Sequence, residues 1–142
     1  MLREIPVIIT PELMKAMMEM GHSDTLILAD ANFPAATNAK KLIRAEGVEI
    51  PELLEAILRY FPLDNYVQHP VSLMKPLEHE PVPEIWAEYE SIIRKYDKEK
   101  AFSEFKYIER LDFYKEAQNA YIIVQTGTTA RYANIILQKG VV

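Results

Sequence analysis

Residues 20–34 read MGHSDTLILADANFP, a segment in which a helix end, a short apolar strand and a carboxylate-bearing loop follow one another directly. Gly21 is typical of the position just past a helix. The apolar run 25–29 is too short for a helix, so it predicts a buried strand. His22 precedes this strand and Asp30 follows it. Loops at strand ends carry binding groups in α/β proteins, because the rigid elements beneath fix their positions.

Helical and strand patterns alternate on either side of this segment. Apolar spacing and end signals predict helices at about 11–20, 51–61, 84–96 and 111–120. Further strands are predicted at 67–74, at an edge or bulge because Pro70 interrupts it, and at 105–108, 121–125 and 134–137. Strands separated by helices predict an α/β fold. We expect a single three-layer α/β/α domain, residues 1–142, around one mostly parallel or mixed sheet.

Composition excludes several classes of protein. The chain of 142 residues is 49% hydrophobic, which is enough for one core without disulfides, and it contains no cysteine. A net charge of −5 argues against a nucleic-acid partner, and it gives no reason to expect binding to anionic membranes. Neither a secretory signal pattern nor an apolar run of about 18 residues is present. We therefore expect a cytoplasmic protein.

The candidate chemistry rests on a few polar residues at predicted element ends. His22 is able to exchange protons near neutral pH, although it also fits a cation at a helix end. Asp24 and Asp30 flank the first strand, where either could instead stabilise a turn. Arg110 begins a predicted helix, and the spacing of four residues places Tyr114 on the same side of that helix as Arg110. Alternatively, Arg110 could form an ion pair with Glu109 or Asp112.

Metal and nucleotide cofactors are not expected. The three histidines lack zinc spacing, and the four glycines form no phosphate-binding loop. The remaining groups are one histidine, carboxylates, an arginine, tyrosines and an asparagine. Such groups suit proton transfer on a neutral polyhydroxylated ligand.

Several sequence blocks together resemble the L-fucose mutarotase and D-ribose pyranase family from end to end. They are Thr10–Leu13, Glu19–Asp24, Ala29–Ala35, Ile43–Gly47, Arg110–Tyr114 and Tyr132–Val141. The Arg110–Tyr114 block is typical of the fucose branch, whereas Ala133 is closer to the pyranase form. The chain departs from the fucose pattern at Ser23 (for Gly), Asn32 (for His) and Glu109 (for Asn).

The resemblance implies a mutarotase that interconverts the anomers of a free monosaccharide, most specifically L-fucose, by ring opening and closure. It places the general acid on His22 and the sugar contacts on Asp30, Arg110 and the Tyr132-Ala133-Asn134 segment, with Asp24 and Tyr114 as supporting residues. It also implies a ring-like homo-oligomer, commonly a decamer, with sites near subunit boundaries. No cofactor or metal is implied.

Three alternatives remain open at this point. One is a D-ribose pyranase, which interconverts the pyranose and furanose forms of the sugar. A sugar-binding protein without catalytic activity could have the same fold. A ketol isomerase would move the carbonyl to C2, and its ketose product would distinguish it.

Overall fold

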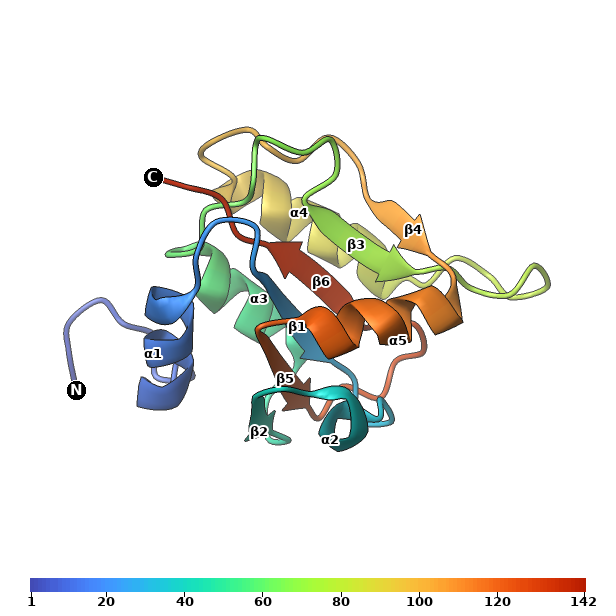
Figure 1. The fold of residues 1–142 in the computed structure, drawn as a ribbon, viewed down its shortest axis with the longest axis horizontal. Helices are drawn as coiled ribbons and strands as arrows, with labels where there is room; N and C mark the ends of the chain where they lie inside the picture. The colour runs from blue at the N-terminus through green and yellow to red at the C-terminus, as the bar shows by residue number, and fades with distance from the viewer.

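The computed structural model describes residues 1–142 and contains five α-helices and six β-strands (Figure 1). The helices are α1 (Pro11–Glu19), α2 (Ala35–Asn38), α3 (Ile50–Leu58), α4 (Ile85–Tyr96) and α5 (Arg110–Asn119). The strands are β1 (Thr25–Ala29), β2 (Leu42–Ala45), β3 (Val71–Met74), β4 (Lys106–Ile108), β5 (Ile122–Thr126) and β6 (Ile135–Gln138). None of the helices is both long and apolar enough to span a bilayer.

All six strands form one mixed sheet in the order β2-β5-β1-β6-β3-β4. β6 runs antiparallel to both of its neighbours, β1 and β3, whereas every other neighbouring pair is parallel. The carboxyl ends of β1 to β5 therefore lie at one edge of the sheet, which is also where β6 begins. We call this the carboxyl edge, and the opposite side, where β1 begins and β6 ends, the amino edge.

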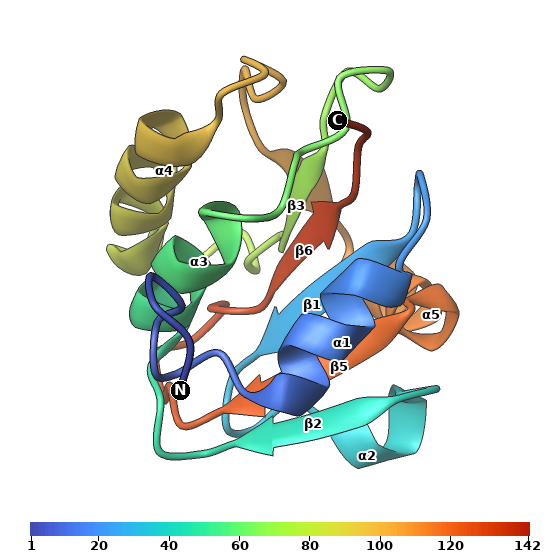
Figure 2. The ribbon, with the colours of Figure 1, turned by 90° about the vertical axis from the view of Figure 1, so that its left-hand side faces the viewer.

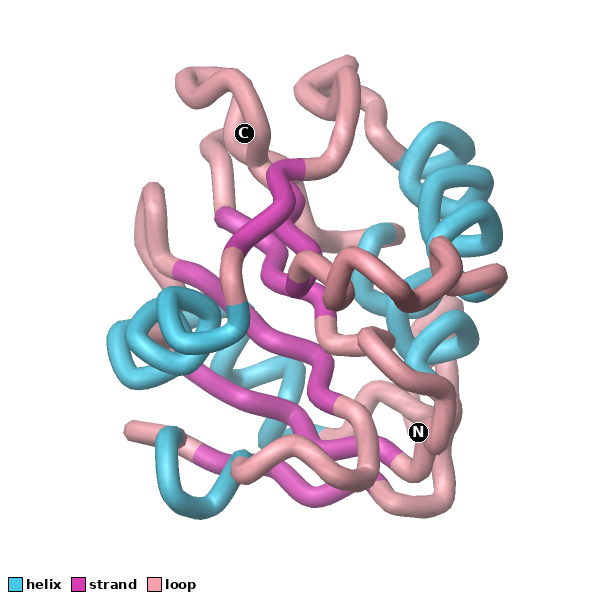
Figure 3. The backbone as a smooth tube through the Cα atoms, turned by 90° about the vertical axis from the view of Figure 1, so that its right-hand side faces the viewer, coloured by secondary structure: helices cyan, strands magenta, loops and turns pink.

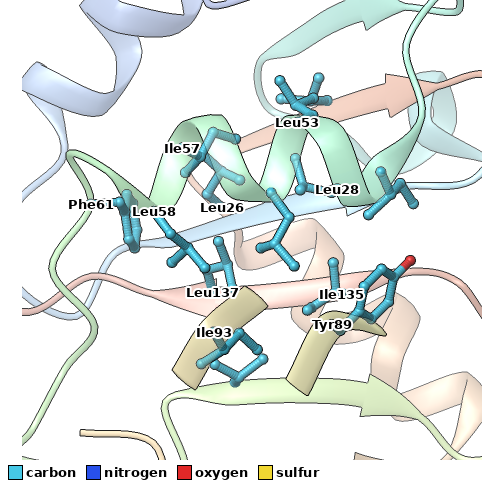
Figure 4. Packing of buried hydrophobic residues seen from close by; sticks show 14 of the residues in the cluster. Leu26, Leu28, Leu53, Ile57, Leu58, Phe61, Tyr89, Ile93, Ile135 and Leu137 are labelled. Atoms are coloured by element: carbon cyan, nitrogen blue, oxygen red, sulfur yellow. The ribbon is translucent and has the colours of Figure 1, made fainter. Parts of the chain in front are cut away.

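Helices cover both faces of the sheet, so the expected three-layer α/β/α fold is confirmed (Figures 2 and 3). On β1, Leu26 and Leu28 pack in the larger apolar cluster with residues of α1, α3 and α4 (Figure 4). Ile27 and Ala29 point to the other face and pack with α2 and α5. This alternation is the two-residue period of a strand that is buried on both faces.

Most elements lie where the sequence predicts them, with two omissions and one correction. β2 and α2 were not predicted: each has only four residues, and β2 is a half-buried edge strand without clear alternation. The predicted strand at 67–74 is shorter, because it begins only after Pro70, and β3 lies inside the sheet rather than at an edge.

The end of α1 differs from expectation in one physical detail. Thr10 Oγ1 accepts a hydrogen bond from Leu13 N at 3.2 Å, which confirms the predicted cap. Gly21 follows the helix, but its φ is not positive. The left-handed residue of this turn is instead Ser23, with φ of 72°. The backbone reversal before β1 therefore falls on a residue with a side chain, at a cost in free energy.

Candidate active site

Most of the predicted site residues meet at the carboxyl edge, around a cavity of about 600 Å³ that we call the carboxyl-edge pocket. Asp30 follows β1, Lys75 follows β3 and Arg110 begins α5 just after β4. The loop before β6 adds Tyr132 and Asn134 to the lining. The mixed sheet thus joins side chains from distant parts of the chain, because five strands end at this edge and the sixth begins there.

Asp30 and Asn134 form a reciprocal pair at the base of this pocket. Asn134 Nδ2 donates to Asp30 Oδ2 at 2.9 Å, and Asn134 Oδ1 accepts from Asp30 N at 2.8 Å. The backbone N–H of Asn32 donates to Asp30 Oδ1 at 2.9 Å. Burial nevertheless raises the pKa of the Asp30 carboxyl, since it outweighs the hydrogen bonds from Asn32, Phe33 and Asn134 that lower it.

Arg110 is an exposed cation whose acidic neighbours are already paired. Glu109 forms an ion pair with Lys75 at 3.0 Å, and Asp112 forms one with Lys115 at 3.9 Å. Arg110 itself lines the carboxyl-edge pocket. The alternative in which Arg110 serves only as an ion-pair partner of its neighbours therefore finds no support in the geometry. A free guanidinium at a pocket wall is suited to holding hydroxyl or carboxylate oxygens.

Tyr114 lies on the same side of α5 as Arg110, as its spacing predicts. The Arg110 guanidinium carbon lies 5.9 Å from the centre of the Tyr114 ring. Phe33 packs edge-on against the same ring, with centroids 5.7 Å apart. Tyr114 therefore forms a half-buried aromatic wall of the pocket.

The loop before β6 is held in place from α4. Trp86 Nε1 donates to the carbonyl of Tyr132 at 2.8 Å, and the Tyr89 hydroxyl donates to the carbonyl of Ala133 at 2.7 Å. Tyr132 has a left-handed backbone, with φ of 54°. This strain is sustained by the surrounding hydrogen bonds, and it turns the Tyr132 side chain into the pocket lining. Ala133 is fully buried and lies behind that lining.

His22 lies at the amino edge, away from the pocket. Its Nε2 is 3.1 Å from Oδ1 of Asp64, a carboxylate that is fully buried. Asp64 also accepts hydrogen bonds from Tyr66 N at 2.9 Å and from Gln138 Nε2 at 3.0 Å. Burial alone would raise the pKa of the Asp64 carboxyl, but these hydrogen bonds outweigh it and hold that pKa below its usual value.

The ionised Asp64 determines which nitrogen of His22 is free. A carboxylate only accepts hydrogen bonds, so the proton of the neutral ring is on Nε2, facing Asp64. Nδ1 is then left to exchange a proton with a ligand. The ring is 41% exposed on its side-chain surface, and Tyr66 lies beside it with centroids 5.2 Å apart.

Asp24 supports the turn that carries His22. Its Oδ2 accepts a hydrogen bond from Gly21 N at 2.8 Å, which closes the turn between α1 and β1. Ser23 N donates to Lys139 O at 2.9 Å, which attaches the same turn to the end of β6. Asp24 is therefore a turn residue, which was one of the two roles considered for it, and it supports His22 through that turn.

The structure thus places the predicted residues in two groups rather than one. β1 separates them, and five strand residues span about 16 Å at 3.3 Å each. His22 and Asp24 lie at one end, and Asp30, Arg110, Tyr114, Tyr132 and Asn134 at the other. One monosaccharide cannot contact both groups of the same chain.

Sequence reasoning did not single out Asp64, Tyr66, Lys75 or Glu80. The signal for Asp64 was available but weak: it is a lone carboxylate directly after the apolar run Phe61–Leu63 that follows α3. No group of three or more histidine, aspartate or glutamate side chains is arranged to hold a metal ion.

Comparison with known proteins gives a family for this arrangement. The sequence pattern of the RbsD / FucU transport protein family matches residues 3–142. The chain belongs to this family. A member from Homo sapiens, fucose mutarotase, is 44% identical over 148 residues, which cover 99% of this chain and 94% of the relative.

Solved members of the family share the fold. The fucose mutarotase from Streptococcus pneumoniae, crystallised in complex with L-fucose, is 48% identical, covers 99% of both chains and has a TM-score of 0.93. RbsD from Bacillus subtilis, complexed with D-ribose, is 19% identical with a TM-score of 0.76, covering 100% of this chain and 99% of that one. The latter comparison supports the fold alone.

The three residues at which we expect the chain to depart from the fucose branch fall in or beside the two groups. Ser23 adopts the left-handed backbone that glycine adopts more readily. Asn32 lines the carboxyl-edge pocket. Glu109 is in the same lining and is paired with Lys75. Each of the three residues therefore lies in the turn that carries His22 or in the surface of the pocket.

Proposed function

We propose that this protein is an L-fucose mutarotase, an isomerase that interconverts the α and β anomers of the free sugar. The observation that carries the proposal is its full-length likeness to a fucose mutarotase that was crystallised with L-fucose. The carboxyl-edge pocket, about 600 Å³ in volume, lies within the roughly 300–1,000 Å³ usual for small-molecule sites. Its lining of tyrosines, an amide and charged groups suits a ligand that is mostly hydroxyl groups.

The reaction requires only two proton movements. The anomeric hydroxyl loses a proton while the ring oxygen gains one, so that the ring opens to the aldehyde. C1 then rotates, and closure gives the other anomer. In this scheme His22 is the general acid that protonates the ring oxygen from Nδ1. The ionised Asp64 holds the ring through Nε2, which leaves Nδ1 for this transfer.

The sugar is held at the carboxyl edge. Arg110 donates to sugar hydroxyls, and Tyr132 and Asn134 provide further polar contacts. Asp30 accepts from a hydroxyl, which would compensate part of the cost of burying its charge. Tyr114 offers an aromatic face to the apolar side of the ring. Ala133 contributes through the backbone that it fixes between Tyr132 and Asn134.

These two groups become one site only if two copies of the chain share it. We propose that the amino edge of one copy, with His22, faces the carboxyl-edge pocket of its neighbour. Such a contact joins two different surfaces, and repeating it gives a ring when the rotation between copies closes on itself. The decamer that the family resemblance implies is one such assembly. The exposed Tyr66 beside His22 and the exposed Leu77 and Leu111 near the pocket provide apolar surface for the contact.

Complementation between two impaired variants, assayed at an L-fucose concentration too low to saturate Arg110→Met, tests the shared site. His22→Ala removes the acid but leaves the pocket, whereas Arg110→Met impairs the pocket but leaves the acid. When the two are unfolded, mixed equally and refolded together, about a quarter of the sites combine both intact halves, because each half is drawn independently in a head-to-tail ring. Recovery of about a quarter of wild-type exchange is expected. No recovery, although sizing shows mixed oligomers, would rule out the shared site.

Anomer exchange followed by NMR tests the activity itself. Magnetisation transfer between the α and β signals of L-fucose should speed up in proportion to protein concentration. D-ribose and D-galactose serve as comparison sugars, and we expect slower exchange for both. Faster exchange of D-ribose would favour the pyranase, and shifted signals without faster exchange would favour a binding protein. The appearance of ketose signals would point instead to a ketol isomerase.

A further inference from the structure

Glu80 lies behind Tyr132, on the loop that connects β3 to α4. Its side chain is only 11% exposed, although the loop is on the surface. One carboxylate oxygen, Oε1, is 2.5 Å from Nη2 of Arg131. The other, Oε2, is buried without a hydrogen-bond partner. A buried carboxylate oxygen without a donor is rare, and it calls for a role.

The same loop presents a donor and an acceptor to one hydroxyl. Leu77 N donates to the Tyr132 oxygen at 3.5 Å, and Leu77 O accepts from Glu80 N at 2.9 Å, which ties the two loop residues into one turn. Because the Tyr132 oxygen already accepts from Leu77, its own hydrogen is free to turn toward the Glu80 carboxylate. Interaction with that carboxylate is the main cause that raises the pKa of Tyr132, and burial adds to it.

The other charged groups around Tyr132 lie on both sides of it. Arg131 precedes it in the chain, and its guanidinium carbon is 5.8 Å from the Tyr132 ring centre. The remaining groups line the two cavities whose linings both include Tyr132: Asp30, Lys75, Glu109 and Arg110 line one, and Glu84 and Glu88 line the other. Among all these groups, Glu80 and Arg131 are the ones that act on the Tyr132 hydroxyl, and their effects on its pKa oppose each other.

We propose that Glu80 is a positioning residue that receives the hydrogen of the Tyr132 hydroxyl, so that the Tyr132 oxygen accepts a hydrogen bond from the sugar. This inference rests on the proposed mutarotase function and extends it to the base side of the reaction. Arg131 holds the carboxylate in place by its ion pair, and Leu77 N–H fills one side of the hydroxyl oxygen. Tyr132 also lines the carboxyl-edge pocket, where the sugar is proposed to bind.

This arrangement gives the proton of the anomeric hydroxyl a route. As the ring opens, that proton passes to the Tyr132 oxygen while the Tyr132 proton passes to Glu80. The ring oxygen takes its proton from His22, so the sugar keeps its number of protons and the total charge is unchanged. Ring closure reverses both transfers, and Glu80 returns to its ionised form.

The variant Glu80→Gln tests the role with little change in shape. An amide can occupy the same space, but it neither carries the charge nor takes the proton. We expect kcat for L-fucose to fall by about a hundredfold, the low end of what acid–base groups contribute, with KM changed less than threefold. Glu78→Gln, two residues earlier on the same loop and exposed, should leave both constants unchanged. Glu80→Asp should recover part of kcat.

A titration that needs no sugar distinguishes this role from a structural one. The tyrosinate absorbance of Tyr132 is obtained by subtracting a Tyr132→Phe variant in each background, because the chain has eight tyrosines. Without the Glu80 charge the Tyr132 phenol should ionise at lower pH, whereas Glu78→Gln should not shift it. An unshifted Tyr132 titration, or equal loss of kcat in Glu78→Gln, would overturn the proposal. If the wild-type protein accelerated no sugar, the proposed function would fail, while the titration would still decide the contact.

Discussion

The two ends of β1 each have a buried aspartate, but the environments of the two carboxylates differ. At the amino edge, Asp64 accepts hydrogen bonds from a backbone N–H, an amide and a histidine, and its pKa is lowered. At the carboxyl edge, burial dominates around Asp30, and its pKa is raised. Asp64 is therefore a stable anion that fixes an exposed imidazole. Asp30 is a costly anion beneath an open pocket, where a ligand hydroxyl would relieve the cost.

Two titratable groups whose pKa values are driven apart by their surroundings suit different tasks. The amino edge has the proposed general acid but lacks the ligand-binding wall. The carboxyl edge has the binding wall, which includes Arg110, and the proposed base side of the reaction at Tyr132. A single copy of this chain therefore carries two half-sites, one at each end of β1.

Removing the imidazole should give the largest effect. We expect His22→Ala to lower the rate of L-fucose anomer exchange by about two to four orders of magnitude, the usual contribution of a general acid. Sugar affinity and thermal stability should change little, because His22 lies outside the pocket and is exposed. Exchange by NMR and calorimetric titration of L-fucose measure the two quantities. Full activity in this variant would reduce His22 to a cation at a helix end.

The converse result is expected at the carboxyl edge. Arg110→Met should weaken L-fucose binding by about 1.5–3 kcal/mol, the worth of hydrogen bonds to a charged group. Its melting temperature should stay near that of the wild type, because the neighbouring carboxylates pair with lysines. Lys115→Met, on the same helix, is the matched control and should bind the sugar normally. A large loss of stability with unchanged affinity would show that Arg110 has a structural role.

The two edges differ in how many of their site residues can be predicted from the sequence alone. The buried run at Thr25–Ala29 and the turns around it place His22 and Asp30 at opposite ends of one strand. Arg110 and Tyr114 follow from helical spacing. Asp64, by contrast, is brought beside His22 by long-range packing across 42 positions, and no local period encodes such a contact. β2 escaped prediction because four half-buried residues give too short a pattern.

The pH dependence of stability should have opposite signs for the two aspartates. Asp64 has a lowered pKa in the folded state, so it adds stability above its unfolded pKa of about 3.9, and this is lost as the pH falls through the folded value. Asp30 has a raised pKa, so its contribution is present below that unfolded value and is lost as the pH rises through the folded one. Asp64→Asn should therefore flatten the loss of stability in acid, and Asp30→Asn should steepen it. Urea unfolding at several acidic pH values measures both slopes, and slopes of the same sign would contradict the comparison.

Backbone strain gives the smallest and most local contrast. Both edges hold a left-handed residue that is not glycine, Ser23 beside His22 and Tyr132 in the pocket. The strain at Ser23 comes from its Cβ, which glycine lacks. Ser23→Gly should therefore raise the free energy of unfolding by about 0.5 kcal/mol, because the strain relieved exceeds the extra conformational entropy that glycine loses on folding. Ser91→Gly, at an exposed position in α4, should instead lower it by about 0.5 kcal/mol, because glycine weakens a helix interior. Urea unfolding of the two variants measures the difference. If both substitutions destabilised the protein equally, the left-handed turn before β1 would not be strained, and the preference for serine there would need another cause.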